Sequence, residues 1–267
     1  MKKAAILFLI TALVGCTHYY YAPNAANIPL FKEQDTFKGK AGVGGGNNYT
    51  GGDIQLAYSP GKKIGIMVNS FFAGKTEQVG EITTGEGTHE ESGKGSYIEA
   101  GLGYYKAFGE KKVWIFETYG GAGIGGENHI YNFQETSRLN ISKYFIQPSF
   151  GYSSHRGTLE IALGSRFSRL NLKINQTNIS EANNQSSKVD LDYISIHPSS
   201  FLWEPSIMLA AGWPNIKFYF QLTESANLTT SYLAQDSENF NLGIKVSLKN
   251  KPGNREKLKT SNVGLSL

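Results

Sequence analysis

Side chains that could do chemistry are thinly scattered along this sequence. Asp190, Asp192 and His197 are close together and could be read as metal ligands, because carboxylates and imidazole are common donors. None of the five histidines has a serine and a carboxylate spaced so that a hydrolytic triad can be argued. The glycine runs 42–46 and 121–126 lack the following helix that a phosphate loop needs, so strand curvature explains them better. We therefore predict no catalytic residue, no metal site and no cofactor.

A set of charged residues that alternate with apolar neighbours is more informative. Alternating residues share one face of a strand. A charge facing lipid costs about 2–4 kcal/mol for Arg or Lys at the midplane, so in a membrane barrel this face must line the lumen. Confined opposite charges should pair, and Arg166 is the expected hub because its fork can bind two carboxylate oxygens. The predicted luminal network is Glu99, Glu117, Glu160, Arg166, Glu204 and Lys217. The same face carries Asp53, Gln55, Gln147, Gln221, Lys245, Tyr97, Tyr105, Tyr119, Phe145 and Tyr219.

The elements that would position these residues are strands. Period-two alternation recurs along the chain, as in Ile54–Tyr58, and helical periodicity is nearly absent. About ten strands are predicted, at 38–45, 54–58, 63–72, 96–105, 113–124, 144–152, 158–170, 201–213, 216–223 and 240–248.

The connections between these strands indicate the architecture. Tight turns with Pro, Gly or polar residues are predicted at 59–62, 108–111, 153–157 and 214–215. Longer polar connections are predicted at 46–50, 74–95, 125–141, 173–200 and 224–239. Short and long connections alternate, as in outer-membrane barrels, where an even strand number returns both ends to the periplasm. We predict an all-β, antiparallel up-and-down barrel that spans a membrane, with short periplasmic turns and long external loops.

Three tryptophans fit such a barrel. Trp203 and Trp213 share a strand face, about 23 Å apart along the membrane normal at the usual rise and tilt. That matches an apolar band of about 25 Å with aromatic girdles at its edges, and Trp114 would join the periplasmic girdle. A soluble β-protein with these residues in its core stays open as the alternative.

The N-terminus has the parts of a secretory signal. Lys2 and Lys3 precede an apolar stretch, 4–14, that is too short to span a bilayer as a helix. The run Leu13-Val14-Gly15-Cys16 resembles the lipobox of bacterial lipoproteins. This resemblance implies cleavage before Cys16, a diacylglycerol on its sulfur and an acyl chain such as palmitate on the new N-terminus. Cys16 is the only cysteine, so no intramolecular disulfide can form.

The segment after the cysteine is too rich in proline and too irregular for a strand, so we interpret 16–36 as a lipid-anchored tether. Its sequence Tyr21–Leu30, together with Tyr144–Pro148, is similar to an uncharacterised family of lipid-anchored outer-membrane β-barrel lipoproteins of Gram-negative bacteria. The resemblance implies an outer-membrane barrel without catalytic residues. Thr17 stands where an inner-membrane retention signal would place Asp, and the acidic run that carries some lipoproteins to the cell surface is missing.

Length and charge complete the domain prediction. The expected domains are a signal peptide at 1–15, the tether at 16–36, the barrel at 37–249 and a basic tail at 250–267. The net charge of +4 is concentrated in the signal and the tail, so it does not indicate a nucleic-acid-binding face.

These features lead to one expectation and two alternatives. We expect an outer-membrane lipoprotein with periplasmic N- and C-termini, held by acylated Cys16 and by its barrel wall. Its expected role is non-enzymatic, as a structural or accessory component of the envelope whose loops contact a ligand or an envelope protein. The alternatives are a periplasmic lipid-anchored soluble barrel that binds a small apolar ligand, and an outer-membrane hydrolase.

Overall fold

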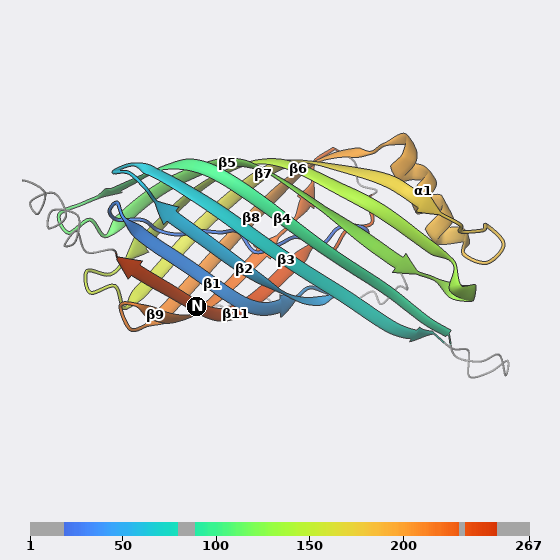
Figure 1. The fold of residues 1–267 in the computed structure, drawn as a ribbon, viewed down its shortest axis with the longest axis horizontal. Helices are drawn as coiled ribbons and strands as arrows, with labels where there is room; N and C mark the ends of the chain where they lie inside the picture. The colour runs from blue at the N-terminus through green and yellow to red at the C-terminus, as the bar shows by residue number, and fades with distance from the viewer. Residues whose placement is uncertain (1–18, 80–88, 230–232, 250–267) are drawn as a thin grey trace, which may run out of the picture.

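Ten long antiparallel strands close into a barrel in the computed structural model (Figure 1). The structure describes residues 19–79, 89–229 and 233–249. Neighbours along the chain pair from β1 to β9, and the pairs β9–β11 and β11–β1 complete the ring. A two-residue strand, β10 (Ala226–Asn227), pairs with β8. The predicted all-β antiparallel barrel is therefore confirmed. The ten long strands are β1 (Thr36–Gly45), β2 (Thr50–Ser59), β3 (Ile64–Val79), β4 (His89–Phe108), β5 (Trp114–Ile130), β6 (Thr136–Ser153), β7 (Leu159–Thr177), β8 (Ser199–Gly212), β9 (Ile216–Glu224) and β11 (Glu238–Lys249).

The four tight turns lie where the sequence predicts them, all at one end of the barrel, which we call the turn end. They join β2 to β3, β4 to β5, β6 to β7 and β8 to β9. Gly109 and Gly157 adopt positive φ angles of 84° and 69°, which side chains with a Cβ rarely tolerate. The ability of glycine to adopt positive φ angles thus accounts for the conformation of two of these turns. The opposite ends of the strands, with the described connections at 46–49, 131–135 and 178–198, form what we call the loop end.

The loop end differs from the sequence prediction in two ways. Strands β3 to β7 continue well into stretches predicted as loops, so the connection from β5 to β6 is only residues 131–135, with a 3-10 turn, η1 (Asn132–Gln134). In the predicted loop 173–200, residues Gln185–Ile196 form a helix, α1. Both differences have a local cause. In β6 and β7 these strand ends alternate with reversed polarity: Leu139, Ile141 and Leu172 face the lumen and their outward neighbours are polar, so the run of outward apolar residues stops there. Helix α1 buries only Leu191 and Ile194 among its large apolar residues, so its helical periodicity is weak.

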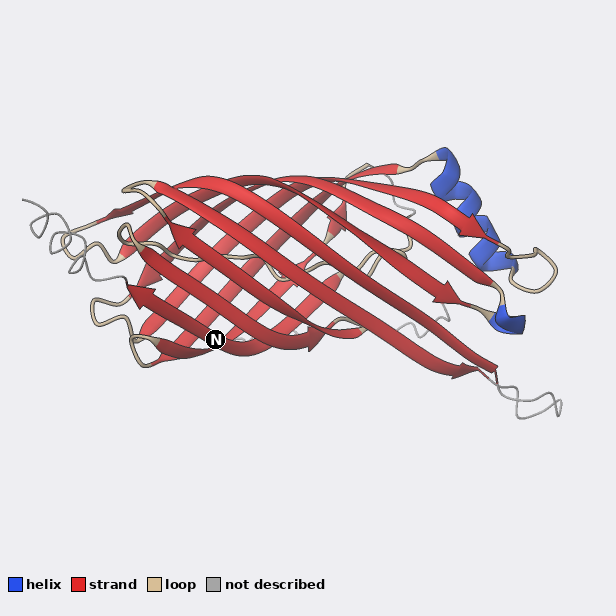
Figure 2. Cartoon of the chain, in the orientation of Figure 1, coloured by secondary structure: helices blue, strands red, loops and turns tan. Residues whose placement is uncertain are grey.

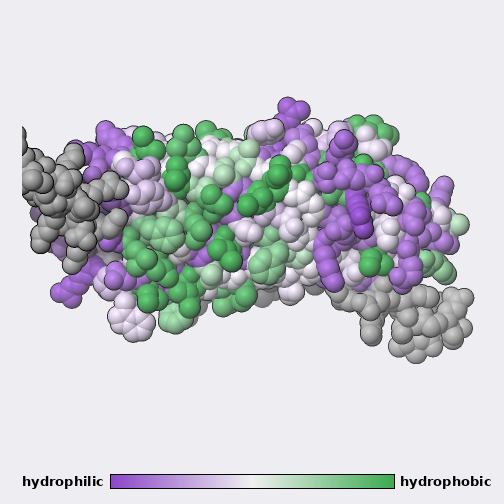
Figure 3. All heavy atoms as spheres, viewed as in Figure 1, coloured by the Kyte–Doolittle hydropathy of each residue, from purple (hydrophilic) through white to green (hydrophobic). Residues whose placement is uncertain are grey.

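The outward face of the barrel is an apolar belt. Its exposed side chains include Val43, Ile54, Leu56, Ile66, Val68, Phe72, Ile98, Leu102, Ile124, Ile146, Leu163, Leu209, Phe218, Leu242 and Ile244. On the described strands the charged outward-facing side chains nearest this belt are Lys106 and Arg169, and Arg169 lies at the loop-end edge between Tyr144 of β6 and Phe201 of β8. Lys106 lies at its turn-end edge beside Phe108 and Trp114, and hydrophilic residues gather at the loop end (Figure 3). Trp203 and Trp213 also face outward.

Among the described residues, no helix is both long and apolar enough to cross a membrane.

Residues 19–35 run through the interior of the barrel as an irregular chain (Figure 2). Tyr20, Ile28, Leu30 and Phe31 are fully buried there. The segment forms no strand, as predicted, and the described part of the predicted tether, residues 19–35, lies inside the barrel. Its apolar residues fill the lumen, so we call residues 19–35 the luminal strap.

Candidate functional site

The luminal strap is held by every long strand of the barrel, and this makes the lumen the candidate functional site. Inward-facing side chains bind its backbone and side chains along its whole length. The partners are Lys38 of β1, Gln55 of β2, Asn69 of β3, Glu99 of β4, Glu117 of β5, Lys143 and Gln147 of β6, Arg166 of β7, Glu204 of β8, Gln221 of β9 and Lys245 of β11. A contact set that includes all ten strands fixes one position for the strap.

Arg166 lies at the centre of the lumen and is 1 % exposed. Its Nη2 is 3.0 Å from Glu99 Oε1, and its Nη1 is 3.4 Å from Glu99 Oε2. The guanidinium also donates to Gln147 Oε1 at 2.7 and 3.0 Å, and to Asn24 Oδ1 of the strap at 3.0 Å. Arg166 thus binds both oxygens of one carboxylate and joins two strands to the strap.

Glu160 is the second centre, close to the turn end. Lys245 Nζ is 2.7 Å from Glu160 Oε2, and Lys38 and Lys217 each approach Oε1 at 3.4 Å. Lys38 and Lys245 also donate to the strap carbonyls of Leu30 and Ile28. The single negative charge of Glu160 is therefore shared by three lysines, and two of these lysines also donate hydrogen bonds to the strap.

Two further carboxylates bind the strap directly. Glu204 accepts a 2.5 Å hydrogen bond from the Tyr21 hydroxyl and pairs with Lys143 at 2.8 Å. Glu117 has a different role from its predicted place in the charge network. Its two oxygens accept hydrogen bonds from the backbone amides of Leu30 and Phe31, at 2.9 and 2.6 Å. The carboxylate satisfies donors that the irregular strap cannot pair with a strand.

Of the six residues predicted to form one network, Glu99 pairs with Arg166, and Glu160 pairs with Lys217. Glu204 instead pairs with Lys143, and Glu117 binds backbone amides of the strap. Sequence reasoning missed Lys38, Lys40 and Lys143, which are all buried on the inward face. The signal was present, because each of these lysines alternates with outward-facing neighbours in its strand. It also missed the strap as the partner of the inward-facing amides.

At the loop end, Glu135 fastens the β5–β6 connection to the chain before α1. Its carboxylate accepts hydrogen bonds from the hydroxyl and backbone amide of Ser180 and from the side chains of Asn183 and Asn184. These bonds, that of the Ser180 hydroxyl first, lower the pKa of Glu135 to about 2. The carboxylate form is therefore the one that holds this corner.

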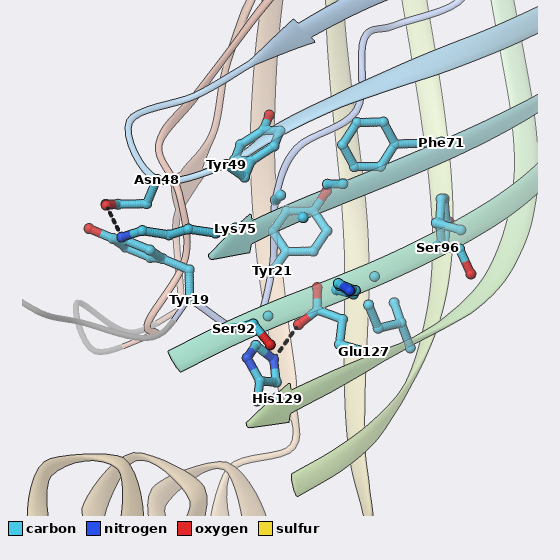
Figure 4. Close-up of a pocket in the computed structure, with 18 of the residues that line it drawn as sticks. Tyr19, Tyr21, Asn48, Tyr49, Phe71, Lys75, Ser92, Ser96, Glu127 and His129 are labelled. Atoms are coloured by element: carbon cyan, nitrogen blue, oxygen red, sulfur yellow. Dashed lines mark hydrogen bonds and ion pairs between the residues drawn. The ribbon is translucent and has the colours of Figure 1, made fainter. Parts of the chain in front are cut away.

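The strap meets the loop end through an aromatic cluster. The Tyr20 hydroxyl lies 3.1 Å from that of Tyr131, and the Tyr20 ring packs edge-on against His129. Burial raises the pKa of Tyr131 to about 12, so its hydroxyl stays protonated. His129 Nε2 lies 3.2 Å from Glu127 Oε2 (Figure 4).

A cavity of about 80 Å³ opens beside this cluster, between the strap and strands β3 to β5. Tyr19, Tyr21, Tyr49, Phe71 and Tyr97 contribute to its lining, and Lys75 reaches Asn48 across its rim (Figure 4). Such a volume holds a few water molecules or a small chemical group. The cavity lies at the mouth of the lumen, and Asn24, which binds Arg166 and Glu99, is part of its lining.

The residues considered as metal ligands are engaged elsewhere. Asp192 pairs with Lys188 along α1, and His197 stacks on Tyr193. Within the described ranges, no group of three or more His, Cys, Asp or Glu side chains could hold a metal ion. Cys16 and the tail 250–267 lie outside the described residues.

Comparison with known proteins adds no identification: no family of known proteins matches this chain, and no curated protein matches its sequence.

Proposed function

We propose that this chain is an outer-membrane β-barrel lipoprotein whose lumen is sealed by its own N-terminal strap. In this proposal the wall spans the membrane, with the turn end in the periplasm and the loop end outside. The protein acts as a non-enzymatic structural or accessory component of the envelope, and its loop end contacts a ligand or a partner protein.

The observation that carries the proposal is the inversion of polarity between the two faces of the wall. The outward belt is apolar, with Lys106 and Arg169 at its two edges, while buried Lys, Arg, Glu and Asp side chains face inward. A soluble protein rarely exposes contiguous apolar patches beyond a few hundred Å². Around a transmembrane barrel the same belt is required, because a lipid-facing Arg or Lys would cost about 2–4 kcal/mol at the midplane.

The filled lumen supports a sealed barrel over a pore. The strap and the inward-facing Tyr105, Tyr119 and Phe145 occupy the interior, and the charges around them are paired or bound to the strap. Interiors of barrels this small can be filled by side chains. The soluble, ligand-binding alternative gains no support from this lumen, because its apolar face points outward and its inward face is polar and occupied.

Among the described residues, no contact favours the hydrolase alternative. The imidazole of His129 faces Glu127 and packs between Tyr20 and Tyr131, which gives it a structural place at the mouth of the lumen.

Membrane fractionation tests the proposal. The protein should stay in the membrane pellet after carbonate washing, and unboiled samples should run differently from boiled ones on a denaturing gel. The Cys16→Ser variant separates the wall from the anchor. It should lose labelling by a fatty acid yet resist carbonate, because the barrel itself remains in the bilayer. Release of this variant into the supernatant would refute the transmembrane wall, and equal labelling of both proteins would refute acylation of Cys16.

A further inference from the structure

The luminal strap carries the chain from one end of the barrel to the other. At the turn end, Lys32 Nζ donates to the carbonyls of Ser153 and Ser154, and the carbonyl of Glu33 accepts from the Ser59 hydroxyl. At the loop end, the amide of Tyr20 donates to the carbonyl of Ala234, and the amide of Asp236 donates to that of Tyr21. Moving backwards from β1, the strap therefore enters at the turn end and leaves at the loop end.

The two ends of the described chain consequently lie at opposite ends of the barrel. Lys249 pairs with Thr36 at the turn end, as an even number of strands requires. Tyr19 lies at the loop end, where it lines the cavity at the mouth (Figure 4). An even strand count alone would place both ends of the described chain at the turn end, but the strap carries Tyr19 to the loop end.

The position of Tyr19 limits where the lipid can be. Cys16 precedes Tyr19 by three residues, which reach at most about 11 Å when fully extended. The strap itself uses residues 19–35 to cross the lumen. Three residues are too few to cross the lumen a second time and return to the turn end.

We propose that the strap threads the barrel to hold acylated Cys16 at the loop end, so that its acyl chains enter the leaflet beside the long loops. The inference rests on the proposed membrane barrel. The loop end then carries the lipid as well as α1, while the C-terminal tail leaves at the turn end. Passage through its own lumen brings the anchor to this face without the acidic export run that the sequence lacks.

Cysteine labelling on cells tests the placement. Three single variants are compared with a membrane-impermeant maleimide: His18→Cys beside the anchor, Ala182→Cys in the loop before α1, and Asn215→Cys in the β8–β9 turn. Ala182 and Asn215 are exposed, so neither substitution disturbs the lumen. The wild type is the background control, since acylated Cys16 has no free thiol. Fatty-acid labelling and heat-modifiable gel mobility verify that each variant is anchored and folded.

His18→Cys and Ala182→Cys should both label on intact cells, and Asn215→Cys only after permeabilisation. A His18→Cys protein that labels together with Asn215→Cys would overturn the threaded anchor while leaving the membrane barrel intact. A reversed pattern, in which only Asn215→Cys labels on intact cells, would keep the anchor at the loop end and invert the orientation. If all three label alike and only after permeabilisation, the membrane barrel itself fails, and the inference fails with it.

Discussion

Removing the Arg166 guanidinium should be the most destabilising single change in the lumen. Arg166→Met keeps an unbranched apolar stem and deletes the charge that binds both oxygens of Glu99. Glu99 retains hydrogen bonds from Asn69 at 2.6 Å and from Asn24 at 3.2 Å, but it loses the cation that binds both of its oxygens. Gln147 and Asn24 also lose the donor that their side-chain oxygens share. Breaking a buried pair by removing one partner typically costs about 3–5 kcal/mol. We expect a loss in that range.

Denaturant unfolding of the purified protein in detergent, followed by fluorescence, measures this loss. Arg169→Met is the matched control, because Arg169 lies on the same strand, faces outward at the loop end and should change stability by less than about 0.5 kcal/mol. The double variant Arg166→Met with Glu99→Gln removes the stranded charge as well, so it should recover part of the loss. If Arg166→Met loses no more than Arg169→Met, the luminal network does not stabilise the fold and the reasoning is refuted.

Three other predictions concern the two ends of the lumen and its closure. Glu160→Gln leaves three lysines without their shared carboxylate and should destabilise the protein by about 3–5 kcal/mol, whereas Glu224→Gln, at an exposed position, should have little effect; equal unfolding curves would contradict this. The pKa of Glu135 is lowered in the fold, so its stabilisation is complete above the ordinary value near 4.5 and is lost only as the pH falls towards 2. Limited acid proteolysis at pH 3 should therefore cut near residue 180 in Glu135→Ala and spare the wild type. Purified wild-type protein in planar bilayers should show no large steady conductance; an open channel would contradict the sealed lumen.

Period-two alternation located the strands because each strand crosses a boundary between an apolar and a polar environment. Ile54, Leu56 and Tyr58 face outward while Asp53 and Gln55 face the lumen, and the structure follows that pattern. Beyond the belt the backbone pairing of β3 to β7 continues, but the outward side chains are mostly polar. In β6 and β7 the alternation persists there with reversed polarity, because Leu139, Ile141 and Leu172 face the lumen between polar outward neighbours. A strand end outside the apolar belt is therefore missed when only outward-facing apolar residues are followed.

The position of the strap depends on contacts that are remote in sequence. Asn24 meets Arg166, and Ile28 meets Lys245, across 142 and 217 positions. No local pattern encodes such partners, and prolines at 23 and 29 correctly excluded a strand without indicating a place. A partial signal existed in the neutral amides Gln55, Gln147 and Gln221, which face inward. Their Nε2 groups donate to strap carbonyls at 2.8, 2.7 and 2.8 Å, while the side-chain oxygens of Gln147 and Gln221 accept from Arg166 and Lys40.

The inward-facing amides also explain why the strap belongs to the fold and is not an appendage that happens to lie inside. A barrel filled by its own side chains could pair its charges with one another and would need few neutral amides. Here the amide side chains of Gln55, Gln147 and Gln221 donate to consecutive backbone carbonyls of residues 25–27, from three different strands. Each such group would cost about 1–3 kcal/mol if it were buried without a partner. Wall and strap therefore stabilise each other: without the strap these amides could be satisfied only by water, and a lumen that admits water would no longer be sealed.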